Sequence, residues 1–150
     1  VNIHPSYLPH NKGYHSSFWG IVNKTPLGAT LHWIDENIDT GDIIDQILLE
    51  DDGIANADKI RKKQRSLCVE LFKKNLFLLL NDKANRTKQD QGGDIHYKKD
   101  IIQATTFSES EMISMGQLVD LIRATDCGEN GFVVKVGDKN IMVKGKVTSI

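Results

Sequence analysis

The chain has few of the residues that mark secreted, metal-binding and membrane proteins. Its 150 residues include two cysteines and three prolines. Cys68 falls in a helical pattern and Cys127 in a loop, so they form neither a disulfide framework nor a metal-ligand spacing, and a reducing cytoplasm is expected. The longest apolar run, residues 76–80, is far shorter than the roughly 20 residues of a membrane span, and no signal-peptide pattern occurs. We therefore expect no membrane partner.

An excess of charge of one sign is also missing. The 19 lysines and arginines nearly cancel the 20 aspartates and glutamates, which leaves a net charge of -1. Such a chain has no long-range attraction for nucleic acid, so small molecules or a second copy of the chain are the expected partners. The length fits one ordinary domain with one core, to which a small appendage can attach.

Hydrophobic periodicity predicts an α/β chain. Val1 to His4 is typical of the end of a buried strand, because Pro5 and Pro9 cannot donate hydrogen bonds to a sheet. The chain begins without Met inside this strand, which suggests that upstream sequence is missing. Apolar spacing further predicts a helix within residues 14–23, strands at 29–34 and 43–49, and a long helix at 58–81.

The composition changes after the long helix. Residues 81–94 are polar and are expected to form an exposed loop. Ser108 and Glu111 form a capping-box pattern for a helix reaching Thr125, and residues 132–136 and 140–144 predict a hairpin. We therefore expect residues 106–150 to form a small unit beside a main part at 1–105. A lone hairpin is marginal in water, so its apolar face is expected to pair with a second copy, or else to fold back on its own core.

Three polar residues at predicted strand-to-loop junctions carry the strongest chemical signal. Asn2, His4 and Asp39 offer an amide, an imidazole and a carboxylate. Acyl transfer needs a donor for the developing oxyanion, a group that titrates near neutral pH, and a carboxylate that orients it or takes a proton. Each residue alone also has an ordinary explanation, as a turn former, a buried histidine or a loop cap. The spacing of the histidines matches no zinc pattern, so no metal is expected.

Other polar residues near this set carry weaker signals. Ser6 lies between two prolines without the G-x-S-x-G elbow, which favours a structural or hydrogen-bonding role over a nucleophilic one. His32 shares a face of its predicted strand with Thr30 and can border the site.

The same residues belong to a longer pattern of motifs. The run NIHPSYLPHNKGYHSSFWGIVNKTPLGATLHWIDENIDTGDIIDQ contains Asn-x-His-Pro-Ser-x-Leu-Pro, a Lys-Gly pair, and an Asp-Thr-Gly loop. It resembles the catalytic core of the folate-dependent formyltransferases and covers about the first third of the chain. The residues that match are Asn2, His4, Pro5, Ser6, Leu8, Pro9, Lys12, Gly13, Asp39, Thr40 and Gly41.

The resemblance implies a fold and a set of roles. The fold would be the carboxyl-terminal part of a doubly wound, Rossmann-like sheet, followed by the small helix and hairpin unit. The first half, with much of the folate pocket, would lie upstream, so the segment alone is expected to be inactive. Both strands would deliver their site residues at their carboxyl ends. The implied catalytic residues are Asn2, His4 and Asp39; the implied folate contacts are Asp35, Ile38, Thr40, Gly41 and Asp42; and the implied substrate contacts are Ser6, Lys12, Gly13, Tyr97 and Lys98.

The implied reaction moves a formyl group from 10-formyltetrahydrofolate to a primary amine without a metal. Asn2 and a protonated His4 would bind the formyl oxygen. Asp39 would raise the pKa of His4 and accept the amine proton, directly or through a water.

The later stretch DIHYKKDI and the short tail resemble the branch that acts on nucleotide-linked amino sugars. The acceptor would be of the dTDP-4-amino-4,6-dideoxyglucose type, the pathway that of O-antigen and other surface polysaccharides, and the assembly a homodimer formed through the carboxyl-terminal region. Tyr97 could stack on a base while Lys98 and Lys99 neutralise a diphosphate, or these residues could be a packed tyrosine beside solvated lysines.

Other reactions of the family remain open: methionyl-tRNA or purine-pathway formylation, hydrolysis of the formyl-folate, or no catalysis in a fragment that only dimerises. Methionyl-tRNA is disfavoured by the missing basic surface.

Overall fold

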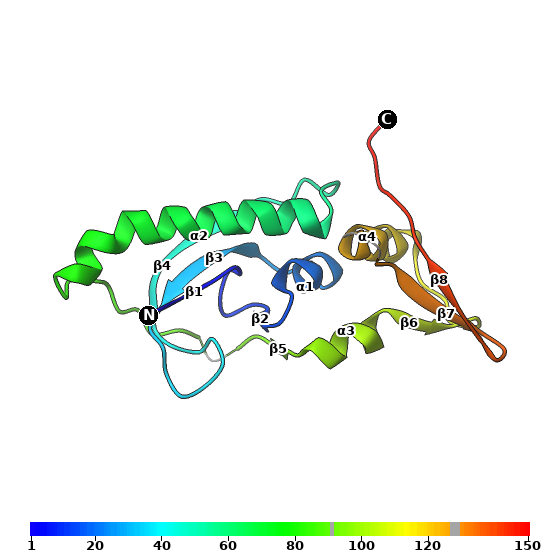
Figure 1. Cartoon of the computed structure of the whole chain (residues 1–150), viewed down its shortest axis with the longest axis horizontal. Helices are drawn as coiled ribbons and strands as arrows, with labels where there is room; N and C mark the ends of the chain where they lie inside the picture. Colours follow the sequence, from blue (N-terminus) through cyan, green and yellow to red (C-terminus); the bar gives the residue numbers. More distant parts are fainter. Residues whose placement is uncertain (91, 127–129) are drawn as a thin grey trace.

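The computed structural model describes residues 1–90, 92–126 and 130–150, so Cys127 lies outside the described residues. Its α/β character agrees with the sequence prediction (Figure 1). The elements are, in chain order, β1 (Asn2–His4), β2 (Lys12–Gly13), α1 (Ser16–Val22), β3 (Leu27–His32), β4 (Ile43–Leu49), α2 (Ala57–Leu80), β5 (Ile95–His96), α3 (Lys98–Ala104), β6 (Thr106–Ser108), α4 (Met115–Thr125), β7 (Phe132–Val136) and β8 (Lys139–Val143).

The central sheet has the strand order β1-β3-β4, and both of its pairings are antiparallel. Every residue of β3 is buried, and Ala29 and Leu31 pack with Ile44 and with Leu71 of α2. In Figure 1 the long helix α2 lies along this sheet. Because the strands are antiparallel, Asn2 at the start of β1 pairs with His32 at the end of β3. The expectation that both strands present their site residues at carboxyl ends therefore holds for His4, the last residue of β1, but is wrong for Asn2, the first.

A second core joins α1, the start of α2 and α4. Phe18 and Ile21 of α1 pack in one cluster with Ile60 and with Ala124 of α4. Arg123 of α4 is buried and its guanidinium forms ion pairs with Asp51, at 2.5 Å, and with Asp120, at 3.1 Å. Helix α4 is thus anchored on the first 105 residues, whereas the hairpin β7–β8 projects beyond it (Figure 1). A division of the chain at 105/106 remains a prediction, and this packing crosses it.

The predicted cap of the carboxyl-terminal helix is wrong. Helix α4 begins after Ser114, whose hydroxyl accepts the Gln117 N–H at 3.1 Å. Ser108 instead ends β6, which pairs in parallel with β7, and its N–H donates to the Glu111 carboxylate at 3.0 Å. The Ser108–Glu111 pattern therefore closes a turn after a strand, because strand pairing already fixes the backbone of Ser108. Strand β6 and helix α3 were both missed.

Most other predicted elements agree with the structure within a few residues. The strand at 43–49 and the first strand of the hairpin are confirmed at both ends, and α2 is shifted by one residue from the predicted 58–81. The strand predicted at 29–34 is β3, which ends two residues earlier. Within the described part of the chain, no helix combines the length and apolarity that a membrane span requires.

Candidate active site

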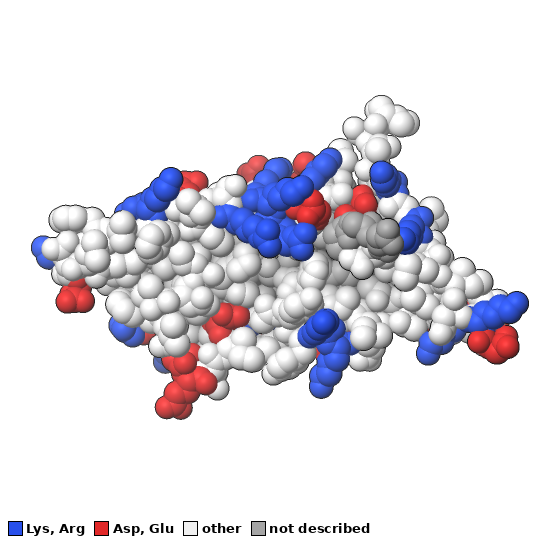
Figure 2. Space-filling model, in the orientation of Figure 1, with Lys and Arg blue, Asp and Glu red and all other residues white. Residues whose placement is uncertain are grey.

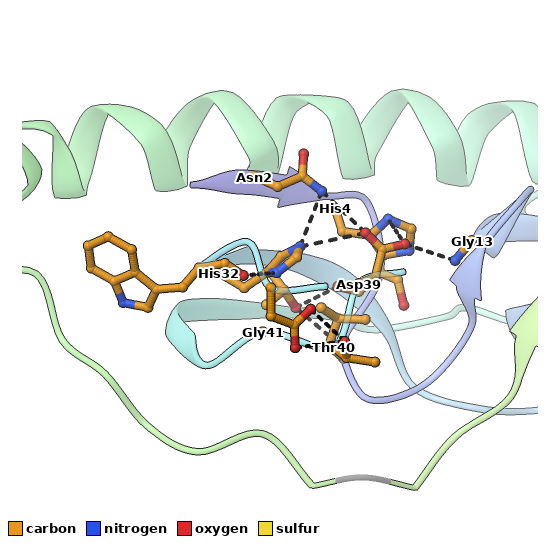
Figure 3. Close-up of polar contacts among 12 residues, drawn as sticks. Asn2, His4, Gly13, His32, Asp39, Thr40 and Gly41 are labelled. Atoms are coloured by element: carbon orange, nitrogen blue, oxygen red, sulfur yellow. Dashed lines mark hydrogen bonds and ion pairs between the residues drawn. The ribbon is translucent and has the colours of Figure 1, made fainter. Parts of the chain in front are cut away.

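The Asp39 carboxylate lies at the centre of a polar cluster from four segments of the chain (Figure 3). Its Oδ2 accepts the Gly13 N–H at 2.9 Å and lies 3.3 Å from His4 Nδ1. Its Oδ1 accepts a hydrogen bond from Asn2 Nδ2 at 3.2 Å and lies 3.6 Å from His32 Nε2. The structure thus brings the three predicted catalytic residues together and adds His32 and the backbone of Gly13.

The tight loop after β3 sets the position of Asp39. Asp39 has a left-handed backbone, with φ of 54°. The Trp33 N–H donates to the Asp42 carbonyl at 2.8 Å and so closes the loop at its base. A Cβ on Gly41 would lie 1.8 Å from the Trp33 carbonyl oxygen, which explains why glycine occupies this position. The loop is consequently held at fixed points on both sides of the carboxylate.

The predicted folate contacts lie on this same loop. Thr40 donates its hydroxyl to Asp35, at 2.7 Å to one oxygen and 2.8 Å to the other, and this hydrogen bond lowers the pKa of Asp35. Ile38 is exposed, and Asp42 pairs with Arg86 at 3.1 Å. Gly41 contributes its carbonyl to Gln89 at 2.7 Å. The loop therefore offers an exposed apolar side chain and carboxylates, but the prediction that it binds folate stays a prediction.

His4 is buried between two acceptors. Its Nε2 faces the Asn11 carbonyl at 3.1 Å and its Nδ1 faces Asp39. A neutral imidazole has only one N–H, so one of these acceptors is unmet until the ring takes a second proton. Burial nevertheless lowers the pKa of His4; it outweighs the opposing effects of Asp39 and the Asn11 carbonyl, and His32 acts in the same direction as burial. The expectation of a raised pKa and a protonated His4 is therefore wrong, although Asp39 does act in the expected direction.

Asp39 carries the charge of the cluster. Burial alone would raise the pKa of its carboxyl, but the interactions with His32, with His4 and with the Gly13 N–H together outweigh that effect and hold the pKa below its usual value. At neutral pH the cluster therefore contains an ionised Asp39 beside a neutral His4. Such a pair can accept one proton.

His32 holds the amide of Asn2. Its Nδ1 lies 2.8 Å from the Trp33 carbonyl and its Nε2 lies 3.2 Å from Asn2 Nδ2. When its proton is on Nδ1, His32 accepts one Asn2 hydrogen while Asp39 accepts the other; when Nε2 carries a proton, it faces Asp39 as a donor. Both amide hydrogens expected to bind an oxyanion are thus engaged within the cluster. The shared strand face of His32 and Thr30 was the available sequence signal for this residue.

Two of the predicted substrate contacts, Ser6 and Lys12, are buried. Ser6 is buried and its hydroxyl donates to the His10 carbonyl, in line with the hydrogen-bonding role favoured by the sequence. Lys12 is only 2% exposed and donates from Nζ to the Gly92 carbonyl at 2.9 Å. Direct contact between Lys12 and a substrate is therefore not what this structure shows. Gly13 both holds Asp39 and lines the cavity described next.

A cavity of about 290 Å³ opens beside His4. Its walls come from the segment 13–17 and from one face of α2, and the lining residues include Tyr14, His15, Arg61, Gln64 and Arg65. Tyr14 and His15 also border a neighbouring cavity of about 240 Å³, which Lys98 lines. Tyr97 instead precedes α3 as a largely exposed side chain, with Lys99 Nζ 5.7 Å from its ring centre. The sequence prediction missed the contribution of α2.

The comparison with known proteins agrees with these motifs. Residues 1–74 match the family model described as formyl transferase. The match covers 74 of the 150 residues and shows that this part of the chain is similar to the formyl transferase family. The dTDP-4-amino-4,6-dideoxyglucose formyltransferase of Mycobacterium bovis is 23% identical over 146 residues, which cover 96% of this chain and 62% of the relative. The methionyl-tRNA formyltransferase of Geobacter sulfurreducens is 26% identical over an alignment of 166 residues. The alignment covers 95% of this chain and 52% of that protein.

Solved structures show the same fold. A 4-N formyltransferase from Francisella tularensis superposes with a TM-score of 0.90 at 30% identity, covering 99% of this chain and 62% of that one. An N-formyltransferase from Helicobacter canadensis, solved with folinic acid and dTDP-3-aminofucose, superposes with a TM-score of 0.73 at 29% identity, covering 93% of this chain and 52% of that one. The formyltransferase fold is therefore confirmed. The chain spans about three fifths of the length of the first relatives it matches.

Proposed function

We propose that this protein transfers a formyl group from 10-formyltetrahydrofolate to the amine of a nucleotide-linked deoxyamino sugar. The observation that carries the proposal is the ionised Asp39 held beside a neutral, buried His4 at the motif positions of the formyl transferase family. An amine that attacks a carbonyl carbon must lose a proton, and this pair is arranged to take one.

The donor supplies the formyl group. The amine nitrogen bonds to the formyl carbon, the bond from that carbon to the folate nitrogen breaks, and its electron pair remains on the folate nitrogen, which takes up the proton that the amine gave to Asp39 and His4. The loop from Asp35 to Asp42 would hold the donor, because its exposed Ile38 can contact a flat ring and its polar groups can meet ring amides.

Proton transfer runs from the amine to Asp39 and then to His4. The side chain of Asp39 is the more exposed of the two, while both ring nitrogens of His4 face protein acceptors. A proton on the His4 ring gives each of its nitrogens a hydrogen bond, to Asp39 and to the Asn11 carbonyl. The charged ring that burial disfavours in the resting site is thus stabilised once the proton arrives.

Asn2 would stabilise the formyl oxygen. Its residue is exposed, and its amide points toward Asp39 and His32 in the resting site. Protonation of Asp39 weakens its hold on the amide, which frees one N–H for the developing oxyanion. One well-placed donor of this kind is worth about 3–4 kcal/mol of transition-state stabilisation.

The nucleotide-sugar acceptor is supported by relatives and neighbours. The Mycobacterium bovis relative is named for dTDP-4-amino-4,6-dideoxyglucose, and the Helicobacter canadensis structure holds a dTDP-linked amino sugar with folinic acid. We extend this acceptor class to the present chain, with dTDP-4-amino-4,6-dideoxyglucose as the first candidate and a role in O-antigen or related polysaccharide synthesis. A cytoplasmic homodimer is part of the same proposal.

The test is a pair of measurements on one preparation. Titration with folinic acid measures folate binding, and an assay with 10-formyltetrahydrofolate and dTDP-4-amino-4,6-dideoxyglucose measures formyl transfer. Both use the 150-residue chain alone and the chain extended with the part of a relative that lies outside the match. We expect binding and transfer in at least the extended form. Lack of folate binding in both forms would overturn the proposal in favour of a non-catalytic, self-associating chain.

A further inference from the structure

The cavity beside His4 contains buried polar atoms that the proposed proton path does not use. Gln64 is 0% exposed; its Nε2 donates to the Pro5 carbonyl at 2.6 Å, while its Oε1 has no hydrogen-bond partner within the described residues. His15 Nδ1 and Arg61 Nε, also buried, have no partner there either. Buried polar atoms are nearly always hydrogen-bonded in folded proteins, so three such atoms around one cavity indicate a polar ligand.

The cavity is also positively charged. Its lining includes Arg61 and Arg65, which lie four residues apart on α2, and it includes no Asp or Glu. Arg61 shares Asp58 with Lys62, at 2.6 and 2.8 Å, so one carboxylate offsets two cations on this turn of the helix. Figure 2 shows Lys and Arg side chains gathered over the amino-terminal half of α2. Burial and the nearby Arg61 charge both lower the pKa of His15, as expected in a cationic site without an anion.

We infer that Arg61 and Arg65, with His15 and Gln64, bind the diphosphate of the nucleotide-linked substrate. This inference rests on the proposed function and names the residues that orient its acceptor. Arginine is suited to phosphate oxygens because its fork donates two parallel hydrogen bonds. His4 borders the same cavity, so a sugar attached to a diphosphate at Arg61 and Arg65 would point its amine toward the triad.

The neighbouring cavity gives the ligand a direction. The two cavities share Tyr14 and His15 as a common wall. At about 290 and 240 Å³, each alone is smaller than a typical site for a drug-sized ligand, so we place the two ends of the substrate in the two cavities, on either side of Tyr14 and His15. Ile101 and Ile102 make the second cavity largely apolar, and Lys98 stands at its edge. The nucleoside end of the substrate fits there, beyond the diphosphate.

Thymidine diphosphate, pyrophosphate and thymidine are the probes for a calorimetric test. The double substitution Arg61→Gln with Arg65→Gln is compared with Lys59→Gln and Lys63→Gln, which remove two exposed charges at the same spacing on the same helix but do not line the cavity. We expect the double arginine substitution to weaken the binding of thymidine diphosphate and of pyrophosphate at least about tenfold, because the charged hydrogen bonds to phosphate are lost. The double lysine substitution should change these affinities less than about twofold. Equal affinities in the two variants would overturn the inference.

A second measurement uses the unsubstituted protein and so does not depend on how the variants fold. An anion beside His15 favours its charged form, so saturating thymidine diphosphate should raise the pKa of His15 in an NMR titration, and thymidine should not. A His15 resonance that ignores the diphosphate would contradict the site.

The two proposals can fail separately. If the unsubstituted protein binds no folate and transfers no formyl group even in the extended form, while Arg61→Gln with Arg65→Gln weakens diphosphate binding, the proposed function is wrong and the anion site stands. If the variant with Arg61→Gln and Arg65→Gln binds diphosphates normally while the unsubstituted protein transfers formyl groups and His4→Ala does not, only the anion site is wrong.

Discussion

The surroundings of Asp39 and the carboxyl-terminal hairpin are built by opposite means. Around Asp39, polar side chains from distant parts of the sequence are bonded to one another, as in the contacts of the exposed Asn2 and the buried His4 with Asp39. In the hairpin β7–β8, apolar side chains such as Ile141 and Met142 remain exposed. The first region specifies chemistry through residues that few others can replace. The second specifies only a shape and an apolar surface, which many sequences can provide.

The largest effects should follow from removing either member of the proton-accepting pair. His4→Ala and Asp39→Ala are each expected to lower turnover by about two to four orders of magnitude with little change in acceptor affinity, because both act on charge formed in the transition state. Steady-state formyl transfer in the active form of the protein measures this. His10→Ala is the matched control and should stay near the normal rate. A His4→Ala enzyme as fast as that control would refute the mechanism.

His32 should have a smaller effect because it acts through Asn2 and Asp39. His32→Ala is expected to lower turnover by about tenfold to a hundredfold through misplaced groups. His32→Gln, whose side-chain oxygen can still accept a hydrogen bond from Asn2, should recover part of the lost turnover. Since His32 lowers the pKa of His4, its removal should also move the acid limb of the turnover profile to higher pH. Loss of turnover with an unmoved pH profile would reduce His32 to a purely structural role.

Two glycine substitutions compare how tightly the loop around Asp39 and helix α4 of the carboxyl-terminal part constrain an added side chain, measured as the free energy of unfolding. Gly41→Ala would press its Cβ against the Trp33 carbonyl, so we expect a loss of about 1–3 kcal/mol in the free energy of unfolding, together with lost activity. At Gly116 in α4 the nearest atom to an added Cβ is 3.9 Å away, so Gly116→Ala should gain up to about 1 kcal/mol. Denaturant unfolding of both variants checks this. A Gly41→Ala protein as stable as the unsubstituted one would show that the loop is not held as described.

The smallest effect on turnover is expected from the hairpin. Met142 is 55% exposed there, and Met142→Glu should weaken self-association while leaving the rate per chain nearly unchanged. The control is Met112→Glu, on a residue that is 93% exposed between β6 and α4. Sedimentation velocity measures the assembly of both variants. The same particle mass in the two would mean that the hairpin face takes no part in association. Truncation near Ala104 is a poorer test, because it also removes α4 from the core.

These contrasts explain what could be read from the sequence. The proximity of Asn2, His4 and Asp39 was predictable because they fit one longer pattern of motifs, while their catalytic roles stay predictions. Strand β4, helix α2 and the hairpin were predictable because their apolar periodicity is strong. The lowered pKa of His4 was not predictable, because it depends on how far burial outweighs the effect of the Asp39 charge. The interior position of Lys12 depends on the distant Gly92 carbonyl, and the start of α4 on the pairing of Ser108 with β7. Interactions over long sequence separations decided each of these.

The coupling between His4 and Asp39 is the central claim, and the titration of His4 followed by NMR tests it most directly. Burial lowers the pKa of His4 and Asp39 raises it, so the unsubstituted protein should titrate at His4 below pH 6.5, and Asp39→Asn should move that titration lower still. Turnover should correspondingly fall as pH drops through the His4 pKa, since the protonated ring can accept no further proton. A His4 that titrates at or above 6.5, or whose titration does not respond to Asp39→Asn, would contradict the account.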